Sequence, residues 1–181
     1  MAGRLLDDKR FGLIKIKNFQ EDTVEQFRKT LMGFESGGNR VEGLILDLRN
    51  NPGGLLDQAV ALCDFFLSRG VIVKTVGARG EMLENERAQP GDGGEEIPLV
   101  VIVNENSASA SEIVAGTLQN NDRALVIGNR SFSKGSVQTV FDLKDGSALK
   151  LTIAKYLTAK DYSVQSKGIN PDVGLIPVTV P

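Results

Sequence analysis

The sequence contains no histidine and only one cysteine, Cys63. Without histidine, a Ser-His-Asp triad cannot form, so a serine enzyme of this sequence needs lysine as its base, a known variant of the triad. A single cysteine excludes an internal disulfide and a cysteine-rich metal site. Because Cys63 lies among Ala61, Leu62 and Phe65, we expect its thiol to be buried in the core.

Strong net charge and long apolar runs are also missing. A net charge of −2 and a pI near 5.3 give no electrostatic case for binding nucleic acid or an anionic membrane. No apolar run approaches the roughly 20 residues of a membrane span, and no signal peptide is evident. The length of 181 residues and the ordinary composition predict one soluble domain over residues 11–181, after a flexible segment at 1–10.

The apolar periodicity predicts alternating strands and helices, an α/β fold with a mixed sheet of repeated ββα-like units. Residues 77–96 are polar and glycine-rich, which favours a hairpin tip or a mobile loop between two strands. We expect helices over 22–32, 55–67 and 112–119, and strands over 11–17, 41–48, 71–76, 98–103, 124–128, 138–143, 148–157 and 174–180.

Three small-residue loops follow three of these strands. The first holds Gly53 and Gly54, the second holds Ser107, Ser109 and Ser111, and the third surrounds Lys134. Each has an ordinary explanation as a tight turn, a helix cap or a solvated charge. Because such loops gather at the carboxyl ends of strands in an α/β sheet, their combination favours an active site with Ser109 as its nucleophile.

The segments SASASEI and SKGSVQ, with DLRNNPGG upstream and KGINPDV downstream, resemble the carboxyl-terminal processing proteases, also called tail-specific proteases. The resemblance covers roughly Leu5 to Val173 and implies a crotonase-like core. Two positions differ from the residues usual in that family, which often has aspartate in place of Asn120 and glycine in place of Ser133.

The resemblance also implies roles for individual residues. Ser109 would be the nucleophile of a Ser-Lys dyad and Lys134 its general base. Gln138 would orient the lysine, and the backbone amides of Gly54 and Ala110 would form the oxyanion hole. No metal or cofactor is expected.

The implied activity is that of a serine endopeptidase that cleaves proteins near their C-termini through an acyl-enzyme. Its partner would be a polypeptide with an extended or unstructured C-terminus, in the periplasm or cell envelope. The family usually carries a PDZ domain ahead of this core, and we find none before Leu5. We expect Asp47, Arg49 and Glu112 to support the site through ion pairs.

Two alternatives use the same scaffold. One is a non-catalytic ligand- or peptide-binding module, as in interphotoreceptor retinoid-binding protein, although this chain retains both the serine and the lysine. The other is a crotonase-like acyl-CoA enzyme, whose catalytic carboxylates and adenosine-diphosphate pocket we do not find in the sequence.

Overall fold

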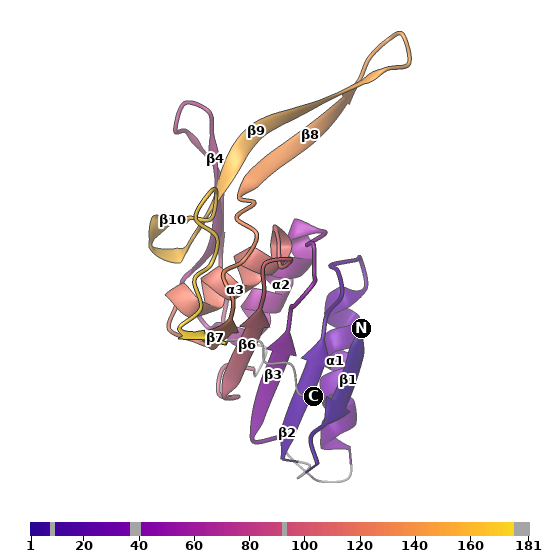
Figure 1. The fold of residues 1–181 in the computed structure, drawn as a ribbon, viewed down its shortest axis with the longest axis vertical. Helices are drawn as coiled ribbons and strands as arrows, with labels where there is room; N and C mark the ends of the chain where they lie inside the picture. The colour runs from indigo at the N-terminus through magenta and orange to yellow at the C-terminus, as the bar shows by residue number, and fades with distance from the viewer. Residues whose placement is uncertain (8–9, 37–40, 92–93, 176–181) are drawn as a thin grey trace, which may run out of the picture.

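Two β-sheets enclose a layer of helices in the computed structural model, which describes residues 1–7, 10–36, 41–91 and 94–175 (Figure 1). Helix α3 (Ala110–Asn120) packs between them, against β7 (Leu125–Gly128) of the first sheet and against β4 (Val71–Gly77) and β9 (Ala148–Thr158) of the second. None of the described helices is long and apolar enough to cross a bilayer. The expected mixed α/β architecture is confirmed.

The first sheet has the order β1-β2-β3-β6-β7-β11. Strands β2, β3, β6, β7 and β11 run parallel, and β1 pairs antiparallel with β2 at one edge. The central strands β3 and β6 are rich in Val, Ile and Leu, and all of their residues are buried or half-buried. The remaining bounds are β1 (Ala2–Leu5), β2 (Phe11–Lys15), β3 (Gly43–Asp47), β6 (Leu99–Val103) and β11 (Val173–Gly174).

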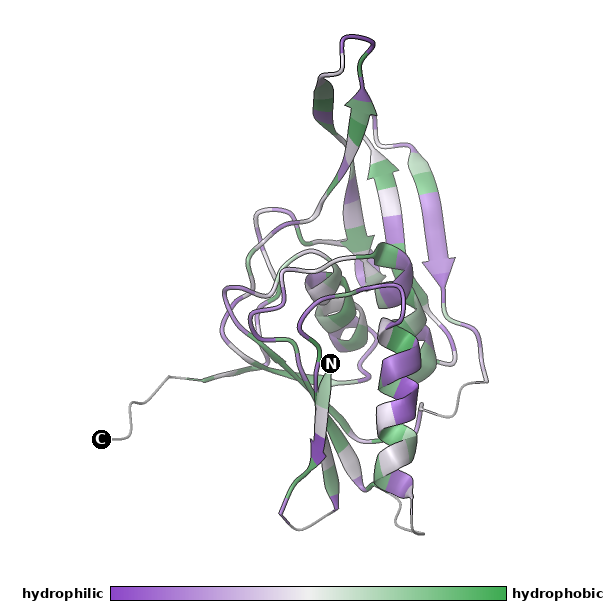
Figure 2. Cartoon of the chain, turned by 90° about the vertical axis from the view of Figure 1, so that its right-hand side faces the viewer, coloured by the Kyte–Doolittle hydropathy of each residue, from purple (hydrophilic) through white to green (hydrophobic). Residues whose placement is uncertain are grey.

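The second sheet is antiparallel, in the order β10-β9-β4-β5, and β8 pairs with the outer part of β9. Strands β8 and β9 form a long hairpin that projects beyond the rest of the molecule (Figure 1). In Figure 2 the projecting strands carry hydrophobic as well as hydrophilic segments. The remaining bounds are β5 (Met82–Arg87), β8 (Ser136–Asp142) and β10 (Tyr162–Ser163), with a short 3₁₀ turn at Ala159–Asp161.

Helices α1 (Thr23–Glu35) and α2 (Leu56–Phe66) complete the core. The rings of Phe27, Phe65 and Phe66 meet edge to face, with centroids 5.0–5.6 Å apart. Such contacts add about 0.5–1.5 kcal/mol per pair to the burial of the rings. Cys63 is fully buried beside them, as predicted, and its burial raises the pKa of the thiol.

The structure differs from three of the expectations about secondary structure, and one of these falls partly on residues outside the described part. The segment predicted to be flexible at 1–10 contains β1, because its backbone pairs with the exposed edge of β2. Within the stretch 77–96, Met82–Arg87 form β5, which pairs with β4 and has no apolar periodicity because all of its residues are exposed. Of the last predicted strand, 174–180, only Gly174 is assigned as strand, in β11, and residues 176–181 lie outside the described part.

Candidate active site

The glycine loop after β3 and the serine turn after β6 are joined by hydrogen bonds. The backbone N–H of Ala108 donates to the carbonyl of Asn51 at 3.0 Å. The Ser107 hydroxyl donates to the carbonyl of Leu48 at 2.8 Å, and the Ser111 hydroxyl donates to Asn51 at 3.1 Å. Both serines are fully buried, and their hydroxyls satisfy backbone carbonyls of the glycine loop.

Ser109 occupies the sharp turn that begins α3. Its backbone has φ 54° and ψ −116°, a conformation that non-glycine residues adopt at a cost of about 1–3 kcal/mol. The residue is half-buried between two buried alanines, Ala108 and Ala110. A strained serine at a strand-to-helix turn is a conformation typical of an exposed nucleophile at the start of a helix.

Gly53 and Gly54 lie beside this turn. A Cβ atom on Gly53 would lie 2.8 Å from the Cβ of Ser109 and 3.0 Å from the backbone nitrogen of Ala110. Gly54 has φ 142°, and a Cβ there would lie 2.1 Å from the carbonyl oxygen of Phe19. Only glycine fits these two positions, and the fold brings the predicted oxyanion loop next to Ser109 and Ala110.

The buried carboxylate of Glu112 connects the serine turn to the lysine loop. One oxygen accepts hydrogen bonds from the backbone N–H of Ser109 at 3.0 Å and of Lys134 at 2.8 Å. The other accepts from the backbone N–H of Ser133 at 2.7 Å and from the hydroxyl of Ser131. Glu112 therefore supports the site through N–H and O–H donors, which corrects the expectation of an ion pair.

The loop before β8 holds Lys134 in a half-buried position. Its anchors are the N–H of Phe132, bonded to the carbonyl of Ser107 at 3.0 Å, and the N–H of Gly135, bonded to the side-chain oxygen of Gln165 at 3.0 Å. Ser133 adopts φ 82°, a left-handed conformation that favours glycine. The loop is thus fixed to the serine turn on one side and to the C-terminal segment on the other.

Gln138 lies apart from the backbone network of this loop. It is exposed in β8, and its amide nitrogen donates to the hydroxyl of Thr152 on β9 at 3.4 Å. Among the described hydrogen bonds, none joins Gln138 to Lys134. Its role in orienting the lysine remains a prediction.

Asp47 and Arg49 flank the start of the glycine loop and form the expected ion pair. The Arg49 guanidinium donates to both oxygens of the Asp47 carboxylate at 2.9 Å, and Lys15 lies 3.5 Å from it. Burial alone raises the pKa of Asp47, but the hydrogen bonds and charge of Arg49, with the charge of Lys15, hold it below its usual 3.8. The pair fixes the end of β3 from which the loop departs.

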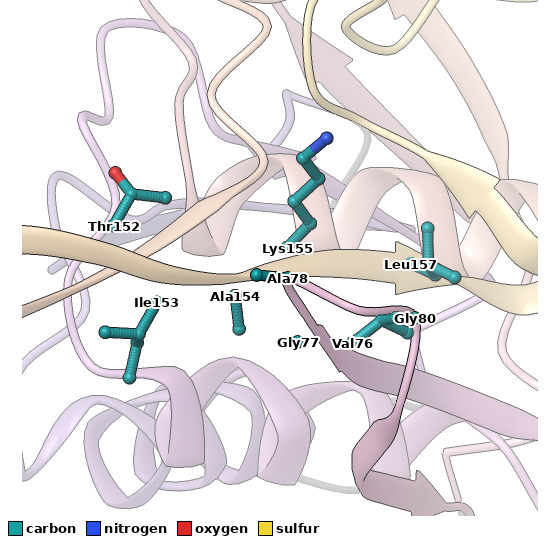
Figure 3. A pocket seen from close by; sticks show the side chains of 9 residues that line it. All are labelled: Val76, Gly77, Ala78, Gly80, Thr152, Ile153, Ala154, Lys155 and Leu157. Carbon is teal, nitrogen blue, oxygen red and sulfur yellow. The ribbon is translucent and has the colours of Figure 1, made fainter.

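A cavity of about 350 Å³ lies elsewhere, where β4 turns away from β9 (Figure 3). Its lining includes neither Ser109 nor Lys134. It is lined by Val76, Gly77, Ala78, Gly80, Thr152, Ile153, Ala154, Lys155 and Leu157. The features that point to catalysis therefore lie in the three loops.

The sequence model of peptidase family S41 matches residues 10–175 of this chain. The chain is 44% identical over 164 residues to a carboxy-terminal-processing protease of Bartonella bacilliformis, covering 90% of this chain and 38% of that protein. It is 39% identical over 171 residues to the carboxyl-terminal-processing protease of a Synechocystis species, covering 92% of this chain and 39% of that protein.

Among solved structures, the photosystem II D1 C-terminal processing protease superposes with a TM-score of 0.84 at 36% sequence identity. The alignment covers 94% of this chain and 44% of that one. The tricorn protease, at 17% identity and a TM-score of 0.62, shares the fold. The chain spans about two fifths of the length of the curated relatives it matches.

Proposed function

Because this chain belongs to peptidase family S41, we propose that it is the catalytic part of a serine endopeptidase with Ser109 as nucleophile and Lys134 as base. The observation that carries the proposal is the carboxylate of Glu112. It holds the backbone of Ser109 and that of Lys134 through a single oxygen atom, at 3.0 and 2.8 Å. Glu112 thereby couples the position of the nucleophile to that of the base.

The proposed reaction begins when the neutral amine of Lys134 takes the hydroxyl proton of Ser109. The serine oxygen attacks the scissile carbonyl carbon, and the N–H groups of Gly54 and Ala110 stabilise the oxyanion. The C–N bond breaks as the lysine returns the proton to the leaving amine, which leaves an acyl group on Ser109. Water, deprotonated by the same lysine, then attacks the acyl carbon; the bond to the Ser109 oxygen breaks, the lysine returns the proton to that oxygen, and the carboxylic acid is released.

The names of the relatives suggest the substrate class. Proteins called carboxyl-terminal processing proteases cleave polypeptides near their C-termini, and we extend this to the present chain. A polypeptide with an unstructured C-terminus would supply the extended segment that such a site requires. We also propose an extracytoplasmic location, and a PDZ domain in the complete protein that captures the substrate.

Hydrolysis of an unstructured polypeptide by the Ser109→Ala, Lys134→Ala and double variants tests the dyad. Each single change should reduce kcat by at least about 10³-fold, and the double variant should lose no more, because the two groups act as a unit. Lys144→Ala, in the exposed hairpin turn, is the matched control and should retain activity. Turnover by Lys134→Ala comparable with the parent would rule out the proposed base.

A further inference from the structure

The outer edge of β8 is free of strand partners within the described residues. Strand β8 pairs with β9 on one side, from Ser136↔Lys155 to Asp142↔Ala148. Its other side presents backbone N–H and C=O groups along a strand of seven residues. The strand begins directly after the loop that holds Lys134, so this free edge extends outward from the candidate active site.

This edge lacks the protection that exposed edges usually carry. Lysine, other charged side chains and proline at an edge strand prevent it from pairing with other chains. The edge strand at the other side of the same sheet, β5, carries Glu84, Glu86 and Arg87. Strand β8 reads SVQTVFD and has one charge, Asp142, at its far end. The edge of β8 is therefore suited to pairing with an added strand.

The hairpin is also amphipathic. A register shift in the β8–β9 pairing leaves Ile153 without a cross-strand partner. Figure 3 shows Ile153 and Ala154 pointing to one side of β9, and Thr152 and Lys155 pointing to the other. Alternation along the strands places Phe141, Leu149 and Leu151 on the side of Ile153. All four large side chains are 41–46% exposed.

This apolar side is the side that faces the helices. Ala154, which points the same way as Ile153, is buried, and so is Thr158 further along β9. The Thr158 hydroxyl accepts a hydrogen bond from Asn120 of α3, the helix that follows Ser109. The apolar face therefore continues the inner surface of the sheet outward from the candidate site.

We propose that an extended segment of the polypeptide substrate pairs with the free edge of β8 and places apolar side chains, at alternate positions, on this face. This inference rests on the proposed function and adds a docking site to it. The added strand would form backbone hydrogen bonds along Ser136–Asp142, and its apolar side chains would extend the row that contains Phe141. A strand of that length spans about 23 Å, so a substrate needs roughly seven residues beyond the cleaved bond.

A polypeptide substrate fits this edge better than a second copy of the chain does. The stem of the hairpin is fixed to the lysine loop by the hydrogen bond from the N–H of Tyr156 to the carbonyl of Gly135, at 2.8 Å. A strand added to β8 therefore ends beside Lys134 and, through Glu112, beside Ser109. That placement delivers a peptide bond to the dyad.

Binding of fluorescent peptides to the Ser109→Ala variant, measured by anisotropy, tests the docking site without turnover. The probe is a ten-residue peptide with valine or leucine at alternate positions, and its twin carries N-methyl groups on alternate backbone nitrogens. The plain peptide should bind at least about tenfold more tightly, since N-methylation removes the strand hydrogen bonds. Phe141→Ser should weaken its binding about tenfold, whereas Val140→Ser, on the opposite face of the same strand, should not.

Equal binding of the two peptides, or equal effects of Phe141→Ser and Val140→Ser, would overturn the docking site. A concentration-dependent dimer that Phe141→Ser dissociates, with peptide binding unchanged, would also overturn it and assign the edge to a second copy. Labelling of the parent by a small serine-directed phosphonate separates this failure from failure of the proposed function. Val140→Ser should be labelled at the parent rate, whereas absence of labelling in every protein would contradict Ser109 as nucleophile.

Discussion

The carboxylate of Glu112 accepts a hydrogen bond from the backbone N–H of Lys134 at 2.8 Å, across the boundary between α3 and the loop before β8. The same oxygen holds the N–H of Ser109. A buried carboxylate with four donors fixes the distance between the serine turn after β6 and the loop between β7 and β8. Glu112 is thus a positioning residue for the proposed dyad.

Replacing Glu112 should reduce activity more than replacing any exposed carboxylate residue nearby. Glu112→Gln keeps one acceptor oxygen but places an NH₂ group where the second oxygen accepted hydrogen bonds. Each buried donor that loses its acceptor costs about 1–3 kcal/mol. We expect kcat to fall about 100-fold with little change in KM. The control is Glu105→Gln, because Glu105 is exposed in the turn between β6 and Ser107. Unchanged kcat in a folded Glu112→Gln variant would contradict the positioning role.

Gly53→Ala should abolish activity through crowding. The new methyl group would lie 2.8 Å from the carbonyl oxygen of Ala108 and from the Cβ of Ser109, so the loop or the nucleophile must move. Gly80→Ala is a matched control, because it has φ 84° but no atom within 4 Å of the added Cβ. It should cost about 1 kcal/mol of stability and leave kcat/KM unchanged. Equal loss of activity in both variants would point to backbone strain alone.

Ser133 should tolerate glycine better than a branched residue. At φ 82° a β-branched side chain is strained, whereas glycine is not. We expect Ser133→Gly to match the parent in free energy of unfolding to within about 1 kcal/mol and Ser133→Val to lose more than that. Chemical denaturation measures both. Ser136→Val, in extended β8, is the control and should be neutral; equal losses in the two valine variants would contradict the strain.

Asp47 should make stability depend on pH in the acid range. Its folded pKa lies below its usual 3.8, so its contribution is present above that value and is lost as pH falls through the lowered folded pKa. Asp47→Asn should therefore reduce the free energy of unfolding at pH 7 and flatten its decline below pH ~4. Asp142→Asn, on the exposed hairpin, provides the comparison. If the free energy of unfolding of Asp47→Asn falls in acid as steeply as that of the parent, other groups cause the decline.

Much of this architecture can be predicted from local pattern. The buried run GLILD of β3 and the small residues of the serine turn lead directly to a strand and a helix start, and the structure places both there. The exposed edge strand β5 has no apolar periodicity, so its pairing with β4 cannot be predicted from local sequence. The role of Glu112 depends on donors from residues 131–134, which only the tertiary fold brings to its carboxylate.

The backbone strain at Ser109 and Ser133 likewise cannot be predicted from the amino-acid composition. A positive φ at a non-glycine residue arises because hydrogen bonds on both sides determine the backbone, as they do where Phe132 binds Ser107. The structure places the Gln138 amide in β8, where it is exposed and its nitrogen donates to Thr152, and its role in orienting Lys134 stays a prediction.

The most direct test of the dyad is the rate at which a serine-directed phosphonate modifies the protein, with the adduct mapped by mass spectrometry. We predict one adduct on Ser109 in the parent, formed at a rate that depends on Lys134 as the proposed base. Lys134→Ala should slow the modification at least about 100-fold, and Lys144→Ala should not. An adduct on another serine, or a parent-like rate in Lys134→Ala, would contradict the account.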